Sequence, residues 1–352
     1  MNSRDDVPPA TPHPPPGDDA ARSEGALPPI SFPDPQVEAK IRQGLDAVEA
    51  LLKESVKSEY PFVTETSQHL LAAGGKRFRP LVVLLAAQFG DPEAPGVVPA
   101  GVVVELTHLA TLYHDDVMDE ALLRRGADSA NSRWGNTVAI LTGDFLFARA
   151  SDILADLGPE AVRLQARTFE RLVQGQIRET VGPEEGDDPV AHYLRVLADK
   201  TGSLIGTSGR FGAMLSGADG TVRETLTQYG ERIGIAFQLS DDLLDVMSDS
   251  DESGKTPGTD LREGVPTLPV LLLRRAAQPE DAPILAALDG PLDDASLATT
   301  VAALRGHTVM AEARAEVQRW ADDARATLAP LPDVPAKSAL ESLCDFVVRR
   351  SA

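Results

Sequence analysis

The sequence predicts an all-α protein built as one large helical bundle, and three observations carry this prediction. From Val37 onward, apolar residues recur with the 3.6-residue period of an α-helix. The alternating pattern typical of half-buried strands is nearly absent. The densest apolar runs, LVVLLAAQF and GVVVELTHLATLY, fall short of the roughly 18 residues that a membrane span needs, so we interpret them as buried helices.

The helical pattern falls into segments with recognisable ends. Pro80 stands where proline is favoured, at the start of a helix, and the segment before it ends in a glycine pair, Gly74 and Gly75. Two segments, 137–154 and 231–246, are apolar on most faces, which predicts positions inside the bundle. We expect loops near 182–189 and 277–283, and helices at about 37–56, 60–73, 80–89, 97–119, 135–157, 159–180, 190–217, 221–249, 266–277, 307–328 and 336–350.

The N-terminal segment has a different composition. Residues 1–35 contain ten prolines together with acidic and small residues, a composition typical of disorder. We therefore expect a disordered, solubilising Pro-rich tail at 1–35 and a single all-helical domain at 36–352. The tail lacks the basic start and apolar middle of a secretory signal, and it is too acidic for a mitochondrial presequence.

Charge and cysteine content narrow the class of protein. The formal net charge of -21 argues against nucleic acid as a partner, because the phosphate backbone would be repelled. The single cysteine, Cys344, excludes an internal disulfide framework and favours a reducing compartment, which we take to be the cytoplasm. A protein this acidic needs local cations or a metal ion to hold an anionic substrate.

Two clusters of aspartates with the same spacing follow apolar helices. The first lies in YHDDVMDEALLRR and the second, 126 residues later, in FQLSDDLLDV; they comprise Asp115, Asp116 and Asp119, and Asp241, Asp242 and Asp245. Carboxylates four residues apart project from one helix face and repel one another unless a cation lies between them. Oxygen ligands without nearby Cys or His favour a hard cation, Mg²⁺ above all, completed by phosphate oxygens of a substrate. A single cluster would fit a solvated helix end, whereas the repeat favours a metal site.

Cationic residues gather in the polar turns. GGKRFRP supplies Lys76, Arg77 and Arg79 just before a helix start, where backbone N–H groups also favour anions; the other members are Arg124, Arg125, Lys200 beside Thr201, and Lys255. Any one of these side chains is consistent with a solvated loop. As a group they provide the positive charge that a bound polyanion requires. Taken singly, His108 is more typical of a core histidine than of a substrate ligand, and Gln238 could equally be a buried helix amide with an internal partner.

These motifs together resemble the motif series of trans-type isoprenyl diphosphate synthases, and most closely that of bacterial long-chain polyprenyl diphosphate synthases. The stretches GGKRFRP, HDDVMDEALLRRG, GDFLFARA, DKTGSL, FQLSDDLLDV and GKTPGTD with PTLP occur in the family's order from about Lys40 to the C-terminus. The resemblance implies the isoprenoid synthase fold, a helical bundle around a deep central cavity. It also implies a homodimer and a prenyltransferase that condenses isopentenyl diphosphate with an allylic diphosphate.

The resemblance also implies roles for individual residues. Mg²⁺ would be held by Asp115, Asp119, Asp241 and Asp245. Isopentenyl diphosphate would be held by Lys76, Arg79, His108 and Arg125, and the allylic diphosphate by Arg124, Lys200, Thr201, Gln238 and Lys255. Of these, Asp115, Asp119, Asp241, Lys200 and Arg124 would act on the reacting diphosphate. One position departs from the family pattern, since Val265 stands near a common second lysine, for which Arg262 is a candidate substitute.

Product length is predicted from the helix that ends in the first acidic cluster. Ala110 and Thr111 lie about one turn before Asp115, and Thr107 lies one turn deeper. Short-chain family members resemble one another in placing a bulky aromatic side chain there, whereas these side chains are small. We therefore expect an all-trans product of about C30 to C50, of the kind used for a quinone side chain, and a transient membrane contact for its release without a transmembrane segment.

Three alternatives stay open at the level of sequence. A short-chain synthase making C15 to C20 products would share every motif. A class I terpene cyclase would share the first acidic cluster but usually lacks GGKRFRP and has a different second metal motif. A non-catalytic subunit of a heteromeric synthase should have lost aspartates, and all six are present.

Overall fold

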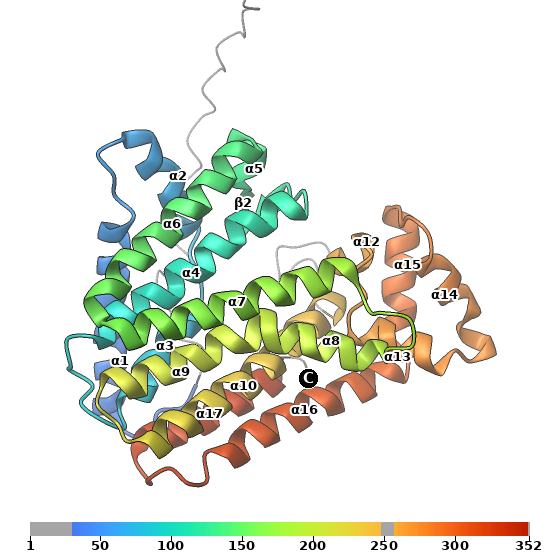
Figure 1. Ribbon diagram of the computed structural model, residues 1–352. Coiled ribbons are helices and arrows are strands. Elements are labelled where there is room, and N and C mark those ends of the chain that lie inside the picture. The colour runs from blue at the N-terminus through green and yellow to red at the C-terminus, as the bar shows by residue number, and fades with distance from the viewer. Residues whose placement is uncertain (1–29, 248–256, 351–352) are drawn as a thin grey trace, which may run out of the picture.

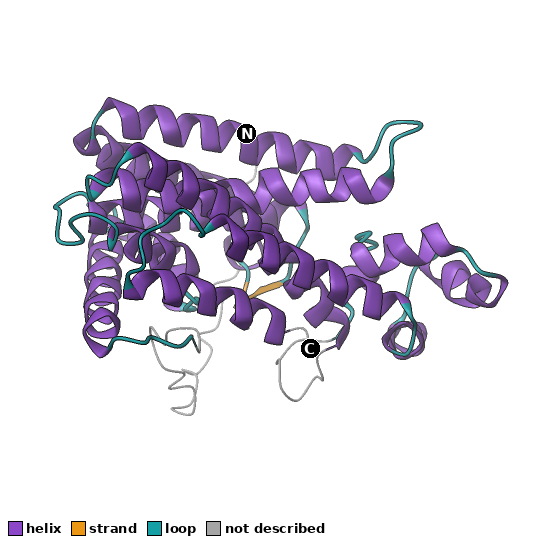
Figure 2. Ribbon diagram, turned by 90° about the horizontal axis from the view of Figure 1, so that it is seen from below, coloured by secondary structure: helices purple, strands orange, loops and turns teal. Residues whose placement is uncertain are grey.

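The computed structural model describes residues 30–247 and 257–350, and within them it is a helical bundle (Figures 1 and 2). The all-α prediction is thus confirmed. The N-terminal half contains α1 (Pro35–Ser55), α2 (Pro61–Ala72), α3 (Phe78–Ala87), α4 (Val97–Met118), α5 (Ala130–Trp134), α6 (Asn136–Leu157), α7 (Pro159–Val181) and α8 (Pro189–Leu197). It also contains a two-stranded hairpin, β1 (Leu123–Arg124) and β2 (Ala127–Asp128).

The C-terminal half begins with a π-helical turn, η1 (Ala198–Gly202), which leads into α9 (Ser203–Leu215) without a break in the rod. The elements that follow are α10 (Gly220–Met247), α12 (Thr259–Arg262), α13 (Leu268–Ala276), the short 3-10 turn η2 (Pro279–Asp281), α14 (Ala282–Leu288), α15 (Asp294–Arg305), α16 (Val309–Thr327) and α17 (Pro335–Arg350). Helices α14 and α15 form an extension at one side of the bundle (Figure 1).

Helix α10 is the axis of the bundle. Helices α7, α9, α10 and α16 lie side by side in that order, while α3 and α4 cover the inner side of α9 (Figure 1). Fully buried side chains such as Phe211, Tyr229, Leu204 and Ile233 fill the space between these layers. Both acidic clusters stand on this framework, one at the C-terminal end of α4 and the other near the end of α10.

Glycines bring α9 and α10 into backbone contact. A Cβ added at Gly230 would lie 2.5 Å from the carbonyl oxygen of Ile205, and one added at Gly234 would lie 2.9 Å from the Cα of Gly202. Only glycine permits so close an approach, because any side chain would have to displace backbone. The contact fixes the distance between η1, which carries Lys200, and the acidic end of α10.

The hairpin after α4 arises from an Arg-Gly turn. Arg125 and Gly126 have φ of 55° and 77°, the positive values at both central residues that a two-residue type I′ turn requires. The register pairs Leu123 with Asp128 and Arg124 with Ala127. The turn reverses the chain within two residues and returns both arginines toward the first acidic cluster.

One prediction about the bundle interior was wrong. The segment 137–154 was expected inside the bundle, but α6 exposes Ile140 and Leu141 by 42% and 61%. The apolar residues of α6 are distributed around the whole helix, and the other helices of the same chain cover only part of its apolar surface. The helix expected at 190–217 is observed from Pro189 to Leu215, and the π-helical turn η1 within it accommodates one extra residue where it carries Lys200.

Other boundaries moved by a few residues. Ile30 and Phe32 pack against the core, so the packed part of the chain begins before the predicted tail boundary at residue 35; for residues 1–29 the disordered tail stays a prediction. Helix α3 begins at Phe78, two residues before Pro80. The short elements β1, β2, α5, α12, α14 and α15 were not predicted. No helix in the described ranges combines the length and apolarity needed to cross a bilayer.

Candidate active site

The first acidic cluster divides its aspartates between two environments. Asp115 is partly buried and Asp119 is exposed, one turn apart on α4. Burial raises the pKa of Asp115 to about 6, with a further contribution from Asp119 and opposition from Lys200 and Arg124. Asp116 is fully buried and accepts a hydrogen bond from Nε of Arg124 at 2.6 Å. Asp115 and Asp119 therefore present the carboxylates of this cluster, while Asp116 holds the hairpin.

The hairpin arginines are anchored from behind. Arg124 bonds Asp116, and Arg125 donates to the carbonyl oxygens of Leu70 and Gly74 at the end of α2. Burial lowers the pKa of Arg125, and the neighbouring Arg77 and Arg124 act in the same direction against Glu105. Several guanidinium groups are thus crowded beside the first cluster, an arrangement that a bound polyanion would stabilise.

The cationic side chains of the GGKRFRP turn lie in different environments. Arg77, in a left-handed conformation at φ 46°, is buried and paired with Glu49 at 2.8 Å and Glu105 at 3.0 Å. Of the three cations expected in this turn, Arg77 is thus a structural one that fixes α3 against α1 and α4. Lys76 is exposed and lies 5.7 Å from the ring centre of Phe237.

Arg79 and His108 are partly buried, and each is within electrostatic reach of Arg125. Nε of Arg79 is buried and has no hydrogen-bond partner among the residues that the structure describes. Burial lowers the pKa of Arg79 to about 10, with Glu105 and Asp241 opposing. Burial also lowers the pKa of His108 well below its usual value, and Arg79 and Arg125 lower it further. His108 is therefore neutral and can offer a ring nitrogen to an anion without adding charge.

In the second cluster each aspartate has a different partner. Asp241 is ion-paired with Arg350 from the end of α17. Asp242 is buried and accepts from the hydroxyl of Tyr193 and, at 3.0 Å, from Nε2 of Gln238. Asp245 accepts from the backbone N–H groups of Thr259 at 3.2 Å and Asp260 at 3.0 Å, at the start of α12.

The partners distinguish Asp241, a candidate metal ligand, from Asp242 and Asp245, whose oxygens bond other parts of the fold. Asp245 was predicted as a metal ligand, but its oxygens are engaged with α12, so its role at the metal stays a prediction that this geometry does not favour. Burial raises the pKa of Asp242 to about 6, against the hydrogen bonds from Tyr193 and Gln238. Asp241 is the member whose carboxylate is paired with a cationic side chain of another helix, Arg350 of α17.

The π-helical turn η1 places Lys200 between α7 and the first cluster. Asp199 pairs with Arg171 at 3.1 Å and with Arg178, and Lys200 pairs with Glu179. A Cβ at Gly175 of α7 would lie 2.7 Å from the backbone nitrogen of Lys200. Burial lowers the pKa of Lys200, but Glu179 and Asp115 outweigh it and the net shift is upward. Lys200 is thus a firmly charged cation that is paired with Glu179 and within electrostatic reach of Asp115.

Thr201 and Gln238 join the two halves of the site. Oγ1 of Thr201 donates to Oε1 of Gln238 at 3.2 Å, and Gln238 donates in turn to Asp242. The predicted pair Thr201 and Gln238 is thus brought together. Lys255 lies outside the described residues. Val265 donates its backbone N–H to Asp260 at 2.8 Å, and Arg262 is ion-paired with Asp294 at 2.6 Å, which gives no support to Arg262 as a substitute lysine.

The predicted chain-length residues occupy different places. Ala110 is fully buried in the apolar cluster that includes Leu146 of α6, so it packs against a neighbouring helix and its role in product length stays a prediction. Thr111 is partly exposed and bonds the carbonyl of His108 at 2.8 Å. Thr107 is fully buried and bonded across to α7.

Sequence reasoning missed several residues of this region. Tyr193, Arg350 and Glu179 contact Asp242, Asp241 and Lys200. They come from α8, α17 and α7, and no local motif marks them. Neither the residues around Tyr193 nor the terminal pair Arg349 and Arg350 have a spacing that points to a ligand.

The comparison with known families agrees with this geometry. Residues 60–303 match the family model described as "Polyprenyl synthetase", a span that contains both acidic clusters and the GGKRFRP turn. The chain belongs to the polyprenyl synthetase family, and the predicted prenyltransferase class is confirmed.

Individual relatives extend the match over nearly the whole chain. A nonaprenyl diphosphate synthase of Mycobacterium tuberculosis is 50% identical over 91% of this chain and 96% of its own length. A geranylgeranyl pyrophosphate synthase structure from Corynebacterium glutamicum, complexed with calcium and isoprenyl diphosphate, has a TM-score of 0.81 and 46% identity, covering 92% of this chain and 99% of that one. A decaprenyl diphosphate synthase structure from Rhodobacter capsulatus has a TM-score of 0.82 and 34% identity, covering 90% and 99%. The predicted isoprenoid synthase fold is thus confirmed.

Proposed function

We propose that this chain condenses isopentenyl diphosphate with an allylic diphosphate to make a long-chain all-trans polyprenyl diphosphate of about C30 to C50. The observation that carries the proposal is the pairing of two acidic helix ends with a surrounding set of cations. Asp115 is within electrostatic reach of Lys200 and Arg124, and Asp241 is ion-paired with Arg350 and within electrostatic reach of Arg79. The 50% identity with a nonaprenyl diphosphate synthase supports the long product.

A divalent metal ion, which we propose to be Mg²⁺, fits the oxygen donors of this site. Within 30–247 and 257–350 no three acidic, histidine or cysteine side chains converge on one point. Such a metal would therefore need substrate oxygens in addition to carboxylates, as Mg²⁺ commonly does. Asp115, Asp119 and Asp241 would hold it. When bound, it would stabilise the negative charge that develops on the departing diphosphate.

The side chains of the chain itself supply the rest of the chemistry. Lys200 and Arg124 would hold the diphosphate of the allylic substrate, with Thr201 and Gln238 fixing the turn that carries Lys200. Arg79, Lys76, neutral His108 and Arg125 would orient isopentenyl diphosphate so that its double bond faces the allylic carbon. Preorganised charges of this kind stabilise the transition state without reorganisation. The proton lost after carbon–carbon bond formation would pass to the released diphosphate, so the reaction needs no dedicated side-chain base.

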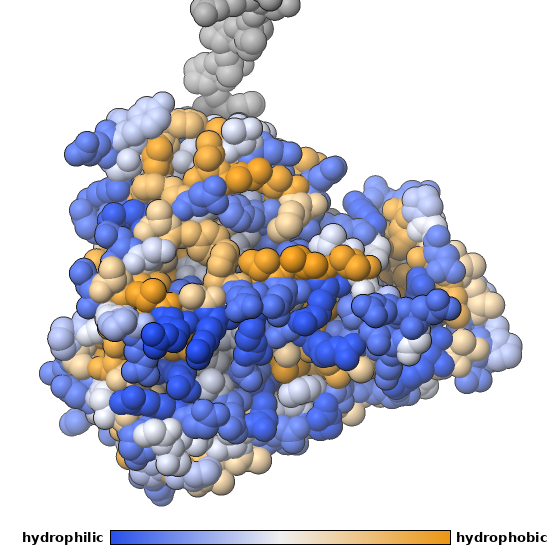
Figure 3. Space-filling view, viewed as in Figure 1, coloured by the Kyte–Doolittle hydropathy of each residue, from blue (hydrophilic) through white to orange (hydrophobic). Residues whose placement is uncertain are grey.

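The apolar outer faces of α6 and α7 support a homodimer. Ile140 and Leu141 of α6 are exposed by 42% and 61%, and Val173 and Ile177 of α7 by 41% and 55%. Figure 3 shows the apolar surface running along α7 with further apolar patches above it. Large contiguous apolar surfaces on soluble proteins mark interfaces. We propose that a second copy covers this face, in a protein of the cytoplasm that contacts membrane only to release its product.

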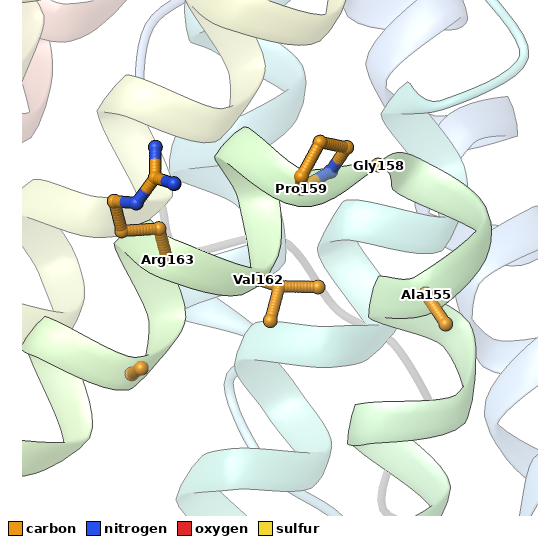
Figure 4. A pocket seen from close by; sticks show the side chains of 6 residues that line it. Ala155, Gly158, Pro159, Val162 and Arg163 are labelled. Carbon is orange, nitrogen blue, oxygen red and sulfur yellow. The ribbon is translucent and has the colours of Figure 1, made fainter.

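Two surface depressions are separate from this chemistry. One of about 590 Å³ lies between the end of α6 and the start of α7, lined by Ala155, Gly158, Pro159, Val162 and Arg163 (Figure 4). The other, of about 540 Å³, is lined by residues of α10 and α16, among them Arg232 and Asp323. Neither is lined by a residue of the acidic clusters, and neither enters the proposal.

Product analysis tests the proposed function. The purified chain is incubated with labelled isopentenyl diphosphate, Mg²⁺ and each allylic starter in turn, and the dephosphorylated products are separated by chromatography. We expect products of about C30 to C50 as the main species. Products that stop at C15 or C20 would support the short-chain alternative, and cyclised or absent products would remove the prenyl-elongating function.

A further inference from the structure

A buried polar contact crosses the interior of the bundle below the first acidic cluster. Gln165 of α7 donates from Nε2 to Oγ1 of Thr107 on α4 at 2.8 Å. The hydroxyl of Thr107 donates to the carbonyl oxygen of Val103, also at 2.8 Å. The threonine proton is therefore already used, and its oxygen accepts from the glutamine amide. Thr107 is 0% exposed and Gln165 is 7% exposed.

The glutamine is incompletely satisfied in this position. Oε1 of Gln165 is buried and has no hydrogen-bond partner within the described part of the chain. A buried acceptor without a partner destabilises the fold, and each such group in a native structure calls for an explanation. An apolar side chain of similar length would pack in this place without that cost. Packing of the core alone therefore does not explain why Gln165 and Thr107 are polar.

The position of the pair on α4 relates it to the reaction. Asp115, Thr111 and Thr107 follow one another at intervals of four residues. Side chains at this spacing form a ridge along one side of a helix. Thr111 bonds within its own helix. Thr107 is thus the first residue of this ridge below Asp115 whose side chain is tied to another helix. It lies two turns, or about 12 Å, along the axis from Asp115.

We propose that Gln165 is a specificity-determining residue, whose hydrogen bond to Thr107 is a cross-brace that the growing hydrocarbon must displace in order to lengthen further. This inference rests on the proposed chain elongation. A hydrocarbon end offers neither donor nor acceptor, so its passage leaves the amide of Gln165 and the oxygen of Thr107 unpartnered. The brace therefore opposes each elongation beyond this level and limits product length.

Two single substitutions remove the same bond from opposite sides. Gln165→Met keeps the length of the side chain and is apolar and flexible, and Thr107→Val keeps the shape of threonine without its hydroxyl. Each should shift the main product by at least one isoprenyl unit toward longer chains. The double variant should shift no further than the single ones, because both act on one contact. Thr107→Ser keeps the acceptor and should restore the wild-type distribution.

Thr168→Val is the matched control. Thr168 is a buried threonine on the next turn of α7, and its Oγ1 lies 2.6 Å from that of Thr207 on α9. The substitution removes a buried hydrogen bond of the same kind without touching α4. We expect a lower melting temperature and an unchanged product distribution. The melting temperature of every variant is measured beside its products.

The outcomes separate this inference from the proposed function. Wild-type protein that transfers no isopentenyl unit would refute the function itself. Wild-type elongation with unchanged or shorter products in Gln165→Met and Thr107→Val would overturn the role of Gln165 alone. An equal shift in Thr168→Val would also overturn it, since general loosening of the core would then explain the longer chains. If Gln165→Met does not fold, the comparison of Thr107→Val with Thr107→Ser decides.

Discussion

Arg350, at the end of α17, forms an ion pair with Asp241 of the second acidic cluster. Its guanidinium carbon lies 4.5 Å from the ring centre of Phe237 and 5.5 Å from that of Phe346. Arg350 is thus stacked between an active-site helix and the C-terminal helix while its charge neutralises the carboxylate proposed to bind metal. Because Arg350 engages Oδ1 of Asp241, a metal ion that needs this oxygen or its negative charge competes with the arginine.

The competition predicts tighter metal binding when the arginine is removed. An ion pair of this kind is worth about 1 kcal/mol or somewhat more, which corresponds to roughly fivefold in a dissociation constant. Arg350→Gln should therefore bind Mn²⁺, measured by paramagnetic resonance in the absence of substrate, about fivefold more tightly than wild type. Arg349→Gln is the control, because Arg349 is exposed. Unchanged or weaker binding by Arg350→Gln would show that the pair does not compete.

Tyr193→Phe should lower stability by removing one hydroxyl. The phenol donates to buried Asp242, whose other oxygen accepts from Gln238, so the phenylalanine leaves a carboxylate oxygen without its donor. Loss of a hydrogen bond to a charged group costs about 1.5–3 kcal/mol. Urea unfolding measures the loss, and Tyr60→Phe is the control, since Tyr60 is 64% exposed. Equal midpoints for both variants would mean that Asp242 does not depend on Tyr193.

Gly230→Ala should destabilise the contact between α9 and α10. The added Cβ would lie 2.5 Å from the carbonyl oxygen of Ile205 and 2.7 Å from the Cα of Gly206, and neither backbone atom can move aside cheaply. Overpacking of this kind costs about 1–3 kcal/mol. Gly220→Ala, on the same helix with nothing within 4 Å of its added Cβ, should be neutral or stabilising by up to about 1 kcal/mol. Thermal unfolding of the pair gives the comparison, and a tolerant Gly230 would refute the close contact.

The single cysteine should be chemically silent in the folded protein. Cys344 is 1% exposed, and burial raises the pKa of its thiol to about 12, against a smaller opposing effect of Arg325. At pH 8 the thiolate, which is the reactive form, is therefore almost absent. Ellman's reagent should release no product from the native chain and should titrate one thiol in urea. Rapid reaction of the native protein would place Cys344 at the surface.

The sequence was sufficient for the parts of the site that depend on local spacing. The repeated aspartate pattern located both acidic helix ends, and the 3.6-residue period located α4 and α10 within two residues. The polar turns at Lys76 and Arg124 were also found, because cations in glycine-containing turns stand out in an acidic chain, whereas Lys200 lies within a helical segment. These features are properties of short windows, so a single sequence contains them.

The partners of these residues could not be read from the sequence. Arg77 lies two residues from Arg79, yet it turns inward to Glu49 and Glu105 because of its left-handed backbone conformation. Tyr193, Arg350 and Gln165 reach the site or the interior through contacts between distant segments, 49, 109 and 58 residues apart. Which aspartate of a cluster faces a ligand and which braces the fold is decided by such contacts, as the division between Asp241 and Asp245 illustrates.

The metal dependence of isopentenyl transfer tests the central claim most directly. Steady-state incorporation of labelled isopentenyl diphosphate is measured for the wild type with Mg²⁺ and with EDTA, and for Asp115→Ala and Asp241→Ala with Mg²⁺. Circular dichroism confirms the fold of each variant. The account predicts that EDTA and either substitution abolish most turnover while the helical signal is retained. Wild-type turnover in EDTA, or in either folded variant, would contradict the claim that the two acidic helix ends hold a metal–diphosphate complex between them.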